Sequence, residues 1–253
     1  MIEFTEAQLL AWITPILWPF LRALALFTAM PVLGTRTVPM RTRIALAALI
    51  ALAAQASLPE MPQVPLDSPA AITLVVQQVV IGLSLGFAVR IVFAGVELAG
   101  ELIGLQMGLN FAGFFDPVNA ASSTATARFF GTTVAWLFIV INGHLLVIAA
   151  LVRSFDAFPV GPEPFAFVRQ LGPHQWGAEV FATGLWIALP LLAMLLFVNL
   201  LLGMISRVAA QINIFAIGFP ITIGIGLLGM LMTLPMMQMP FTMVLERLLS
   251  AFG

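Results

Sequence analysis

The 253-residue sequence contains no cysteine and few charged residues, and each absence narrows what the chain can be. Without cysteine there is no disulfide framework, no thiolate nucleophile and no cysteine-ligated zinc site. Only 8% of the residues are charged, whereas an ordinary soluble domain has about 25%. Hydrophobic residues make up 61%, and the mean hydropathy is +1.10. A soluble enzyme and a disordered chain are therefore excluded, and the composition indicates a polytopic membrane protein.

Basic residues and histidines are equally scarce. The formal net charge is −1, so the chain offers no basic face for nucleic acid. His144 lies in an apolar segment, far in sequence from the other histidine, His174. No metal-binding spacing, nucleotide loop or catalytic-triad order is present, so we predict no metal, no cofactor and no enzymatic activity. His144 is expected to be a buried, hydrogen-bonded group that fixes helix packing.

Long uncharged runs dominate the remaining sequence. A transmembrane barrel would show segments of about ten residues that alternate between apolar and polar. Here the runs are continuous, and about 20 residues of helix cross a bilayer core. The sequence therefore predicts an all-α fold of about six long helices or helical hairpins in one domain, 1–253. The uncharged runs are 68–89, 129–152, 180–206 and 208–245.

The expected helix boundaries follow from these runs and from proline and glycine. We expect Pro15 and Pro19 to interrupt the first helix, and a short second helix to cover 44–58. The third helix is predicted to run from Pro69 as far as residue 108, and the fourth and fifth to cover 129–152 and 179–203. The last run is too long for one simple span. Its breaks are expected at Gly218, Pro220 and Pro235. The acidic N-terminal residues do not resemble a secretory signal, so the first apolar run is expected to stay in the mature protein.

Several polar residues interrupt the apolar segments. An unpaired charge in a membrane helix costs about 2.5–3.5 kcal/mol on insertion scales. Three interpretations remain open: an ion or proton path, buried ion pairs, or segments that do not contact lipid. On the second, each arginine is expected to find an acidic or carbonyl partner within the chain or across an interface. The candidate buried polar residues are Arg22, Arg90, Glu97, Glu101, His144, Arg207, Gln211 and Asn213.

Small residues recur at helical spacing. Gly100, Gly104 and Gly108 lie four residues apart on one face, and Gly82 and Gly86 share the same spacing. Such stripes let helix backbones approach closely. The stripe predicts either packing inside the chain or packing against other subunits. Because it continues beyond the length of one span, we favour contact with other subunits for residues 100–108.

Residues 106–126 have an unusual composition. Three phenylalanines stand among Asn, Ser, Thr and Gly residues, and an Asp-Pro pair is expected to end any helix. This segment is either an ordinary connecting loop or a re-entrant plug, in which the Phe rings close a path and the small residues allow movement. The plug residues are predicted to be Gln106, Met107, Asn110, Phe111, Phe114, Phe115, Asp116 and Pro117.

Several stretches together resemble the FliR family of flagellar biosynthetic export-gate proteins. They follow the order of the family over nearly the whole chain, with Ala210 where the family often has proline. The matching stretches are Phe20-Leu21-Arg22-Ala23, Pro31-Val32-Leu33-Gly34, Val38-Pro39-Met40-Arg41, Glu97 to Gly108, Asp116-Pro117, Asn142-Gly143-His144, Ser154-Phe155, Arg207, Gln211-Ile212-Asn213-Ile214-Phe215 and Gly218-Phe219-Pro220.

The resemblance implies a subunit of the type III protein-export gate that works with FliP, FliQ and FlhB. It would help form and seal the channel that passes unfolded flagellar substrates across the bacterial inner membrane, within the flagellar basal body. The alternatives are the injectisome counterpart of the same gate and a small-solute secondary transporter. A transporter would more often show two related halves, which are not found.

Overall fold

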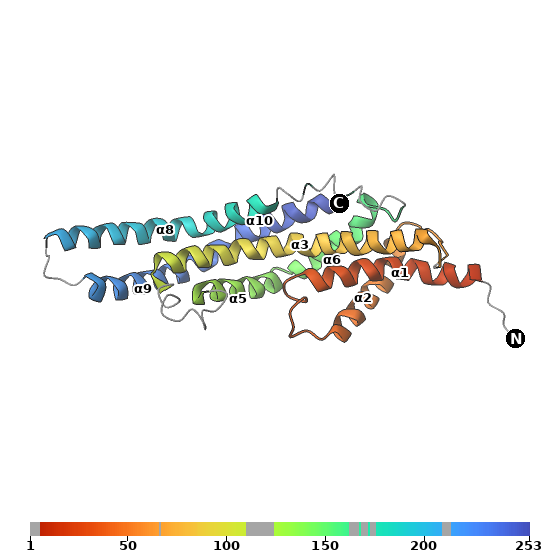
Figure 1. Ribbon diagram of the computed structural model, residues 1–253, viewed down its shortest axis with the longest axis horizontal. Coiled ribbons are helices and arrows are strands. Elements are labelled where there is room, and N and C mark those ends of the chain that lie inside the picture. Colours follow the sequence, from red (N-terminus) through yellow and green to blue (C-terminus); the bar gives the residue numbers. More distant parts are fainter. Residues whose placement is uncertain are drawn as a thin grey trace. The chain divides into compact units, whose positions relative to one another are not determined.

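The computed structural model describes residues 6–65, 67–109, 124–161, 167, 172, 176–208 and 214–253, and within these ranges the chain is helical with no strand. Figure 1 shows the helices in chain order. The predicted all-α fold is confirmed. The elements are α1 (Glu6–Ala29), α2 (Met40–Ala54), a 3-10 turn (Gln55–Ser57), α3 (Pro69–Gln106), α5 (Ala125–Val140), α6 (Gly143–Ala157), α8 (Trp176–Val208), α9 (Ile214–Thr233), a 3-10 turn (Leu234–Met237), α10 (Gln238–Leu249) and a final 3-10 turn (Ser250–Phe252).

Four helical stretches in the described part of the chain are long and apolar enough to cross a membrane. The pair α5 and α6, interrupted at residues 141–142, makes a fifth if it is one broken span. Helix α2 does not reach this length, since its 15 residues give about 22 Å of helix. The four stretches are Leu10–Ala29, Pro69–Gln106, Trp176–Val208 and Ala216–Phe252.

Proline breaks fewer helices than the sequence predicts. Pro15 and Pro19 lie inside α1, which is continuous. The expected break at Gly218 and Pro220 is wrong, because α9 continues through both. A proline removes one backbone hydrogen bond, and the neighbouring bonds of a long apolar helix hold it together across that gap. The break expected at Pro235 is confirmed: it falls in the 3-10 turn Leu234–Met237, where Pro235 stands in the first turn and its missing N–H has no helical partner to lose.

The predicted continuous helix over 129–152 is also wrong. Helix α5 ends at Val140, and Asn142 adopts a left-handed backbone conformation with φ 57° and ψ 31°. The next helix starts at once, because the Asn142 carbonyl accepts a hydrogen bond from the Leu145 N–H at 2.9 Å. Asparagine is one of the few residues other than glycine that visits this region regularly. The apolar pattern did not reveal the break, because a single polar residue produces it.

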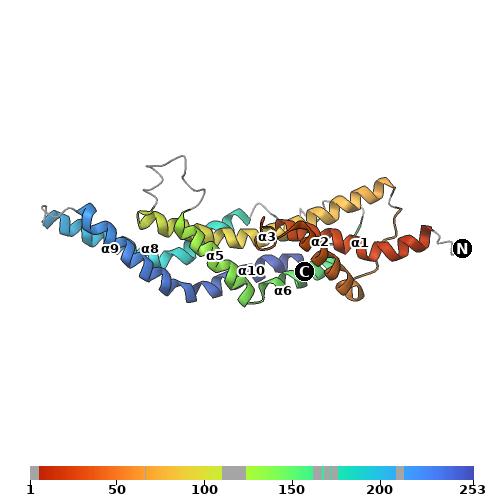
Figure 2. The same cartoon turned by 90° about the horizontal axis from the view of Figure 1, so that it is seen from below.

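The chain divides into two compact units. Unit 1 comprises residues 1–90, 142–176 and 245–253, and unit 2 comprises residues 91–141 and 177–244. Both are therefore built from stretches that are far apart in sequence. Helices α1 and α2 of unit 1 lie against each other in both Figure 1 and Figure 2.

Glycines bring α1 and α3 together in unit 1. A Cβ atom at Gly82 would lie 2.8 Å from the Ala25 Cβ, and one at Gly86 would lie 2.8 Å from the Leu26 carbonyl oxygen. Real Cβ atoms do not approach other atoms so closely, so no larger residue fits at either position. The first glycine pair of the sequence therefore serves packing inside the chain.

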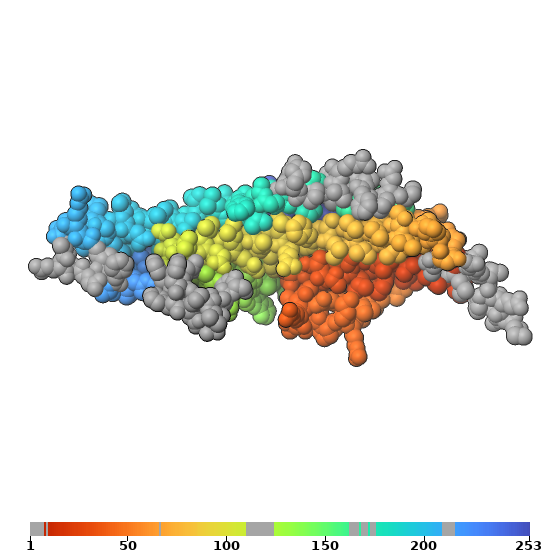
Figure 3. Space-filling view, viewed as in Figure 1, coloured from red at the N-terminus to blue at the C-terminus, as the bar shows by residue number. Residues whose placement is uncertain are grey.

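Unit 2 has an aromatic core and a large apolar surface. The Phe93 ring makes edge-on contacts with Phe138 and Phe241, each with ring centroids 5.6 Å apart. Helix α8, by contrast, buries only 22% of its most apolar stretch, against 61% for α3. Figure 3 shows α8 at the surface of the molecule. Its exposed large side chains include Phe181, Leu185, Trp186, Leu189, Leu196, Phe197, Leu200 and Met204.

Asn142 provides a test of the break between α5 and α6. Replacing it with glycine is expected to preserve stability, because glycine adopts positive φ without steric cost. Replacing it with valine is expected to lower the free energy of unfolding by about 1–2 kcal/mol, because a β-branched residue lacks the short polar side chain that lets asparagine adopt a left-handed conformation. Thermal unfolding of the detergent-purified chain measures the difference. Equal losses in both variants would contradict this account of the break.

Candidate functional site

A buried arginine organises unit 1. Arg22 of α1 is 0% exposed, although it lies in an apolar helix. Its Nε donates to the Gln78 Oε1 at 2.8 Å, its Nη1 donates to the Ser154 carbonyl and hydroxyl at 2.8 and 2.9 Å, and its Nη2 donates to the Phe158 carbonyl at 2.9 Å. The guanidinium carbon also lies 3.6 Å from the centroid of the Phe155 ring. One side chain therefore connects α1, α3, α6 and the turn that follows α6.

The acceptors that hold Arg22 are neutral, and helix geometry explains how they compensate a positive charge. Ser154 lies in the last turn of α6, and Phe158 is the residue that ends it. The carbonyls at the end of a helix carry the negative end of its dipole. The Ser154 carbonyl also accepts from the Phe158 N–H at 2.9 Å, and its second lone pair accepts from Arg22. Arg22 supplies hydrogen bonds to these carbonyls from another helix. The Phe155 ring adds a cation–π contact on the guanidinium face.

A pair of glutamines extends this network. Gln78, which accepts from Arg22, donates through its Nε2 to the Gln77 Oε1 at 2.9 Å. Gln77 also accepts from the Gly161 N–H at 3.2 Å and donates to the Pro159 carbonyl at 3.3 Å. The chain after α6 is thus held by side chains of α3. Gln77 and Gln78 are both buried, and each has hydrogen-bond partners, as burial requires.

The junction between α3 and α5 in unit 2 forms the second site. The Thr124 N–H donates to the Glu101 Oε1 at 3.1 Å, and the Thr124 hydroxyl accepts from the Ala127 N–H at 3.1 Å. Thr124 is thus the N-cap of α5 and is itself held by a carboxylate of α3. A negative charge at a helix N-terminus is favourable by about 0.3–1 kcal/mol when exposed, and by more when partly buried. Glu101 is half-buried.

Gly100 and Gly104 make this junction possible. A Cβ atom at Gly100 would lie 2.7 Å from the Ala127 Cα, and one at Gly104 would collide with the Thr126 hydroxyl. These two residues therefore contact α5 of the same chain. From the sequence we had favoured contact with another subunit, and for Gly100 and Gly104 the structure shows the contact within the chain instead. Gly108 has φ 80° and lies in the turn that ends α3, so its role is conformational.

The residues predicted as a plug fall partly within this junction. Met107 is 1% exposed, and its side chain fills the space that a Cβ atom at Gly226 of α9 would need. Gln106 is half-buried at the end of α3. The other predicted plug residues lie outside the described residues: Asn110, Phe111, Phe114, Phe115, Asp116 and Pro117.

The remaining charged candidates differ from Arg22 in their burial. Arg90, Glu97 and Arg207 are exposed on the single chain, which therefore does not bury them, and His144 is half-buried. Arg207 lies in the last turn of α8, where the helix dipole favours a cation. Gln211 and Asn213 lie outside the described residues. Burial of these groups across an interface stays a prediction.

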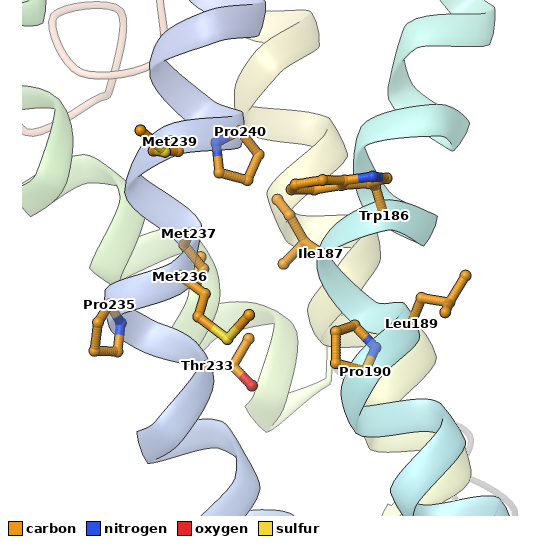
Figure 4. A pocket seen from close by; sticks show the side chains of 10 residues that line it. All are labelled: Trp186, Ile187, Leu189, Pro190, Thr233, Pro235, Met236, Met237, Met239 and Pro240. Atoms are coloured by element: carbon orange, nitrogen blue, oxygen red, sulfur yellow. The ribbon is translucent and has the colours of Figure 1, made fainter.

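A cavity of about 530 Å³ opens between α8 and the break that separates α9 from α10 (Figure 4). Trp186 and Pro190 line one side, and Met236, Met239 and Pro240 line the other. Among the described residues no group of three or more acidic or histidine side chains is placed to hold a metal ion. The cavity wall is apolar, and Thr233 Oγ1, its hydroxyl, donates to the Gly229 carbonyl at 2.7 Å.

Sequence reasoning identified Arg22 but not the residues that bind it. Gln77 and Gln78 are adjacent amides inside an apolar run, and a buried arginine requires such acceptors, so they were detectable. The Ser154 and Phe158 carbonyls were not, because any residue supplies a carbonyl and only the fold determines which ones lie within reach of the guanidinium.

Arg22 gives a sharp stability test. Replacing it with leucine removes the hydrogen bonds to Gln78, Ser154 and Phe158. Each buried acceptor left unsatisfied typically costs about 1–3 kcal/mol of unfolding free energy. Arg22→Lys should recover only part of this, because an ammonium group cannot match the fork of a guanidinium. Arg41→Leu, at an exposed position of α2, is the control. Equal melting temperatures for Arg22→Leu and Arg41→Leu would refute the role given to Arg22.

Gly104 tests whether its contact lies within the chain. Gly104→Ala is expected to destabilise the chain when it is expressed without partners, because the new Cβ collides with Thr126. Adding Thr126→Ala removes the colliding hydroxyl and should recover most of the loss, a coupling of about 0.5–3 kcal/mol. Thermal melting of the two single variants and the double variant measures it. Simple additivity of the losses would show that Gly104 faces something other than Thr126.

Comparison with known proteins gives matches over most of the chain. Residues 13–248 match the model of the family described as bacterial export proteins, family 1. The chain is 42% identical over 241 residues to the flagellar biosynthetic protein FliR of Escherichia coli (strain K12), which covers 95% of this chain and 92% of the relative. It is 39% identical to the FliR of Pectobacterium carotovorum, with the same coverage, and 29% identical over 213 residues to that of Bacillus subtilis (strain 168), covering 81% of this chain and 80% of the relative. The chain therefore belongs to the bacterial export proteins, family 1, the family of the flagellar biosynthetic protein FliR, and is a subunit of a flagellar export apparatus.

Proposed function

We propose that this chain joins FliP, FliQ and FlhB subunits in the export gate of the flagellar basal body. There it helps to form and seal the channel that passes unfolded flagellar substrates across the bacterial inner membrane. The observation that carries the proposal is the match to FliR proteins over 95% of the chain, at up to 42% identity.

The uncovered surface of unit 2 supports a role in an assembly. Large apolar side chains of α8 are exposed, including Phe197 at 60% and Leu200 at 62%. Helices α9 and α10 add a series of exposed methionines, among them Met232, Met239 and Met243. Large exposed apolar patches mark contact with lipid or with another protein. Flexible methionine side chains adapt to partner surfaces.

The α3–α5 junction supports a role for residues 106–126 in sealing. One end of this segment is anchored by Met107, which packs at Gly226. The other end is fixed by Thr124, which donates to Glu101. Phenylalanine rings in a pore exclude water and ions by dewetting, and Phe111, Phe114 and Phe115 lie between these two anchors in the sequence.

The test combines assembly with leakage. Changing Phe111, Phe114 and Phe115 together to alanine is expected to leave co-purification with tagged FliP and FliQ intact. The membrane should nevertheless become leaky to ions and small solutes, because the backbone length is kept and only the apolar barrier is lost. Growth on expression and efflux of a small dye measure the leak, and it should be greatest when the partner subunits are co-expressed.

Phe129→Ala provides the matched control. Phe129 lies near the start of α5 and is 39% exposed, and its loss should leave the membrane tight. A triple variant that assembles fully in a tight membrane would place the seal elsewhere in the complex. Failure of the unmodified chain to co-purify with FliP and FliQ would overturn the proposed assembly itself.

A further inference from the structure

Residues Leu245–Gly253 belong to unit 1, although the stretch immediately before them, 177–244, belongs to unit 2. They comprise the end of α10 and the final 3-10 turn. Leu245 and Phe252 are 0% exposed, and Leu248 and Leu249 are no more than 6% exposed. This segment is therefore part of the core of unit 1 rather than a solvent-exposed tail.

Phe252 connects aromatic residues from separate parts of the chain. Its ring centroid lies 6.2 Å from that of Phe158 and 6.1 Å from that of Trp176. Phe158 also contacts Phe167, with centroids 6.0 Å apart, and Trp176 contacts Phe87 of α3 at the same distance. Aromatic pairs in these geometries stabilise a core beyond the area they bury. Phe252 thus joins two aromatic contacts that would otherwise be separate.

The same residue lies one step from Arg22. The Phe158 carbonyl accepts from the Arg22 Nη2 at 2.9 Å, while the Phe158 ring packs edge-on against Phe252. The position of Phe158 therefore depends on both Arg22 and Phe252. Loss of Phe252 would free the ring and with it the backbone that holds one side of the guanidinium.

The rest of this segment is packed less tightly. A cavity of about 300 Å³ lies between α6 and the last residues, with Leu146 and Arg153 on the α6 side and Glu246, Leu249 and Ser250 on the other. Arg153, Glu246 and Ser250 are exposed, so this cavity is a groove at the surface and not a void in the core. The segment is therefore fixed chiefly by its buried apolar side chains, and Phe252 is the largest of them.

The order of the segments along the chain determines when unit 1 can be completed. Synthesis proceeds from the N-terminal side, so residues 91–141 and 177–244, which make up unit 2, all precede Leu245. The core of unit 1 lacks Phe252 until that point, although residues 1–90 and 142–176 are already present. Unit 1 is thus the unit that closes last.

We propose that residues Leu245–Phe252 form a strap that closes unit 1 and keeps the Arg22 site shut, with Phe252 as its locking residue. Release of the strap opens unit 1 and leaves unit 2 intact. This inference concerns the chain itself and does not depend on the proposed role in the export channel.

The absence of cysteine makes the test direct, since each introduced thiol is unique. Ala23→Cys reports on unit 1, beside Arg22, and Ala188→Cys reports on unit 2; both alanines are 0% exposed. The full-length chain is labelled with a maleimide in native membranes. Phe252→Ala should speed labelling at position 23 by about a hundredfold, the shift in opening expected when a core phenylalanine is truncated. Labelling at position 188 should stay unchanged.

Phe241→Ala is the matched control, because Phe241 of α10 is also 0% exposed and packs in unit 2. It should expose position 188 and leave position 23 protected. Phe252→Leu is measured in parallel and should show a smaller rise in labelling at position 23, again with no change at position 188. It becomes the deciding variant if Phe252→Ala does not accumulate. Continued protection of position 23, or equal exposure of both positions in the Phe252 variants, would overturn the strap.

Discussion

The charge of Arg22 is the constraint on which unit 1 depends. A guanidinium removed from solvent is tolerated only when the protein replaces its hydration. Here the replacement comes from residues 56 to 136 positions away in the sequence, namely Gln78, Ser154 and Phe158. The charge therefore requires that α1, α3 and the end of α6 meet. Apolar helices in an apolar environment gain little from contact with one another, so a polar requirement of this kind selects one arrangement among many.

Small and large residues have different roles in the helix contacts of this chain. Gly82, Gly86, Gly100 and Gly104 all face helices of the same chain and let them approach closely. The outward surface carries bulky side chains instead, with Trp186 of α8 and Met232 of α9 mostly exposed. Close backbone contact thus holds the chain together, whereas its exterior offers wide apolar surfaces. A subunit that must fold as a unit and then be covered by neighbours requires this division.

Hydropathy predicted the parts of the fold that depend on average composition. The all-α class, the length of α3 and the shortness of α2 follow from continuous apolar runs. It failed where a single backbone conformation decides, at Asn142, and where the neighbouring hydrogen bonds of an apolar helix hold it together across a proline, at Pro220 inside α9. In the site, Arg22 stood out because a charge in an apolar run is rare. Its carbonyl acceptors did not, because the fold alone decides which carbonyls lie within reach of the guanidinium.

Glu97 shows that the apolar sequence of α3 does not determine whether lipid, water or protein surrounds each face of the helix. The residue is exposed on α3, a helix that is otherwise long and apolar enough to cross a membrane. A carboxylate facing hydrocarbon carries a penalty of several kcal/mol, but the Glu97 side chain packs against α5, where a new Cβ at Gly131 would lie 3.1 Å from the Glu97 Oε1. The carboxylate therefore lies beside another helix of unit 2. Hydropathy along α3 does not detect this contact, so an apolar run long enough to cross a membrane does not by itself show which face of the helix meets lipid.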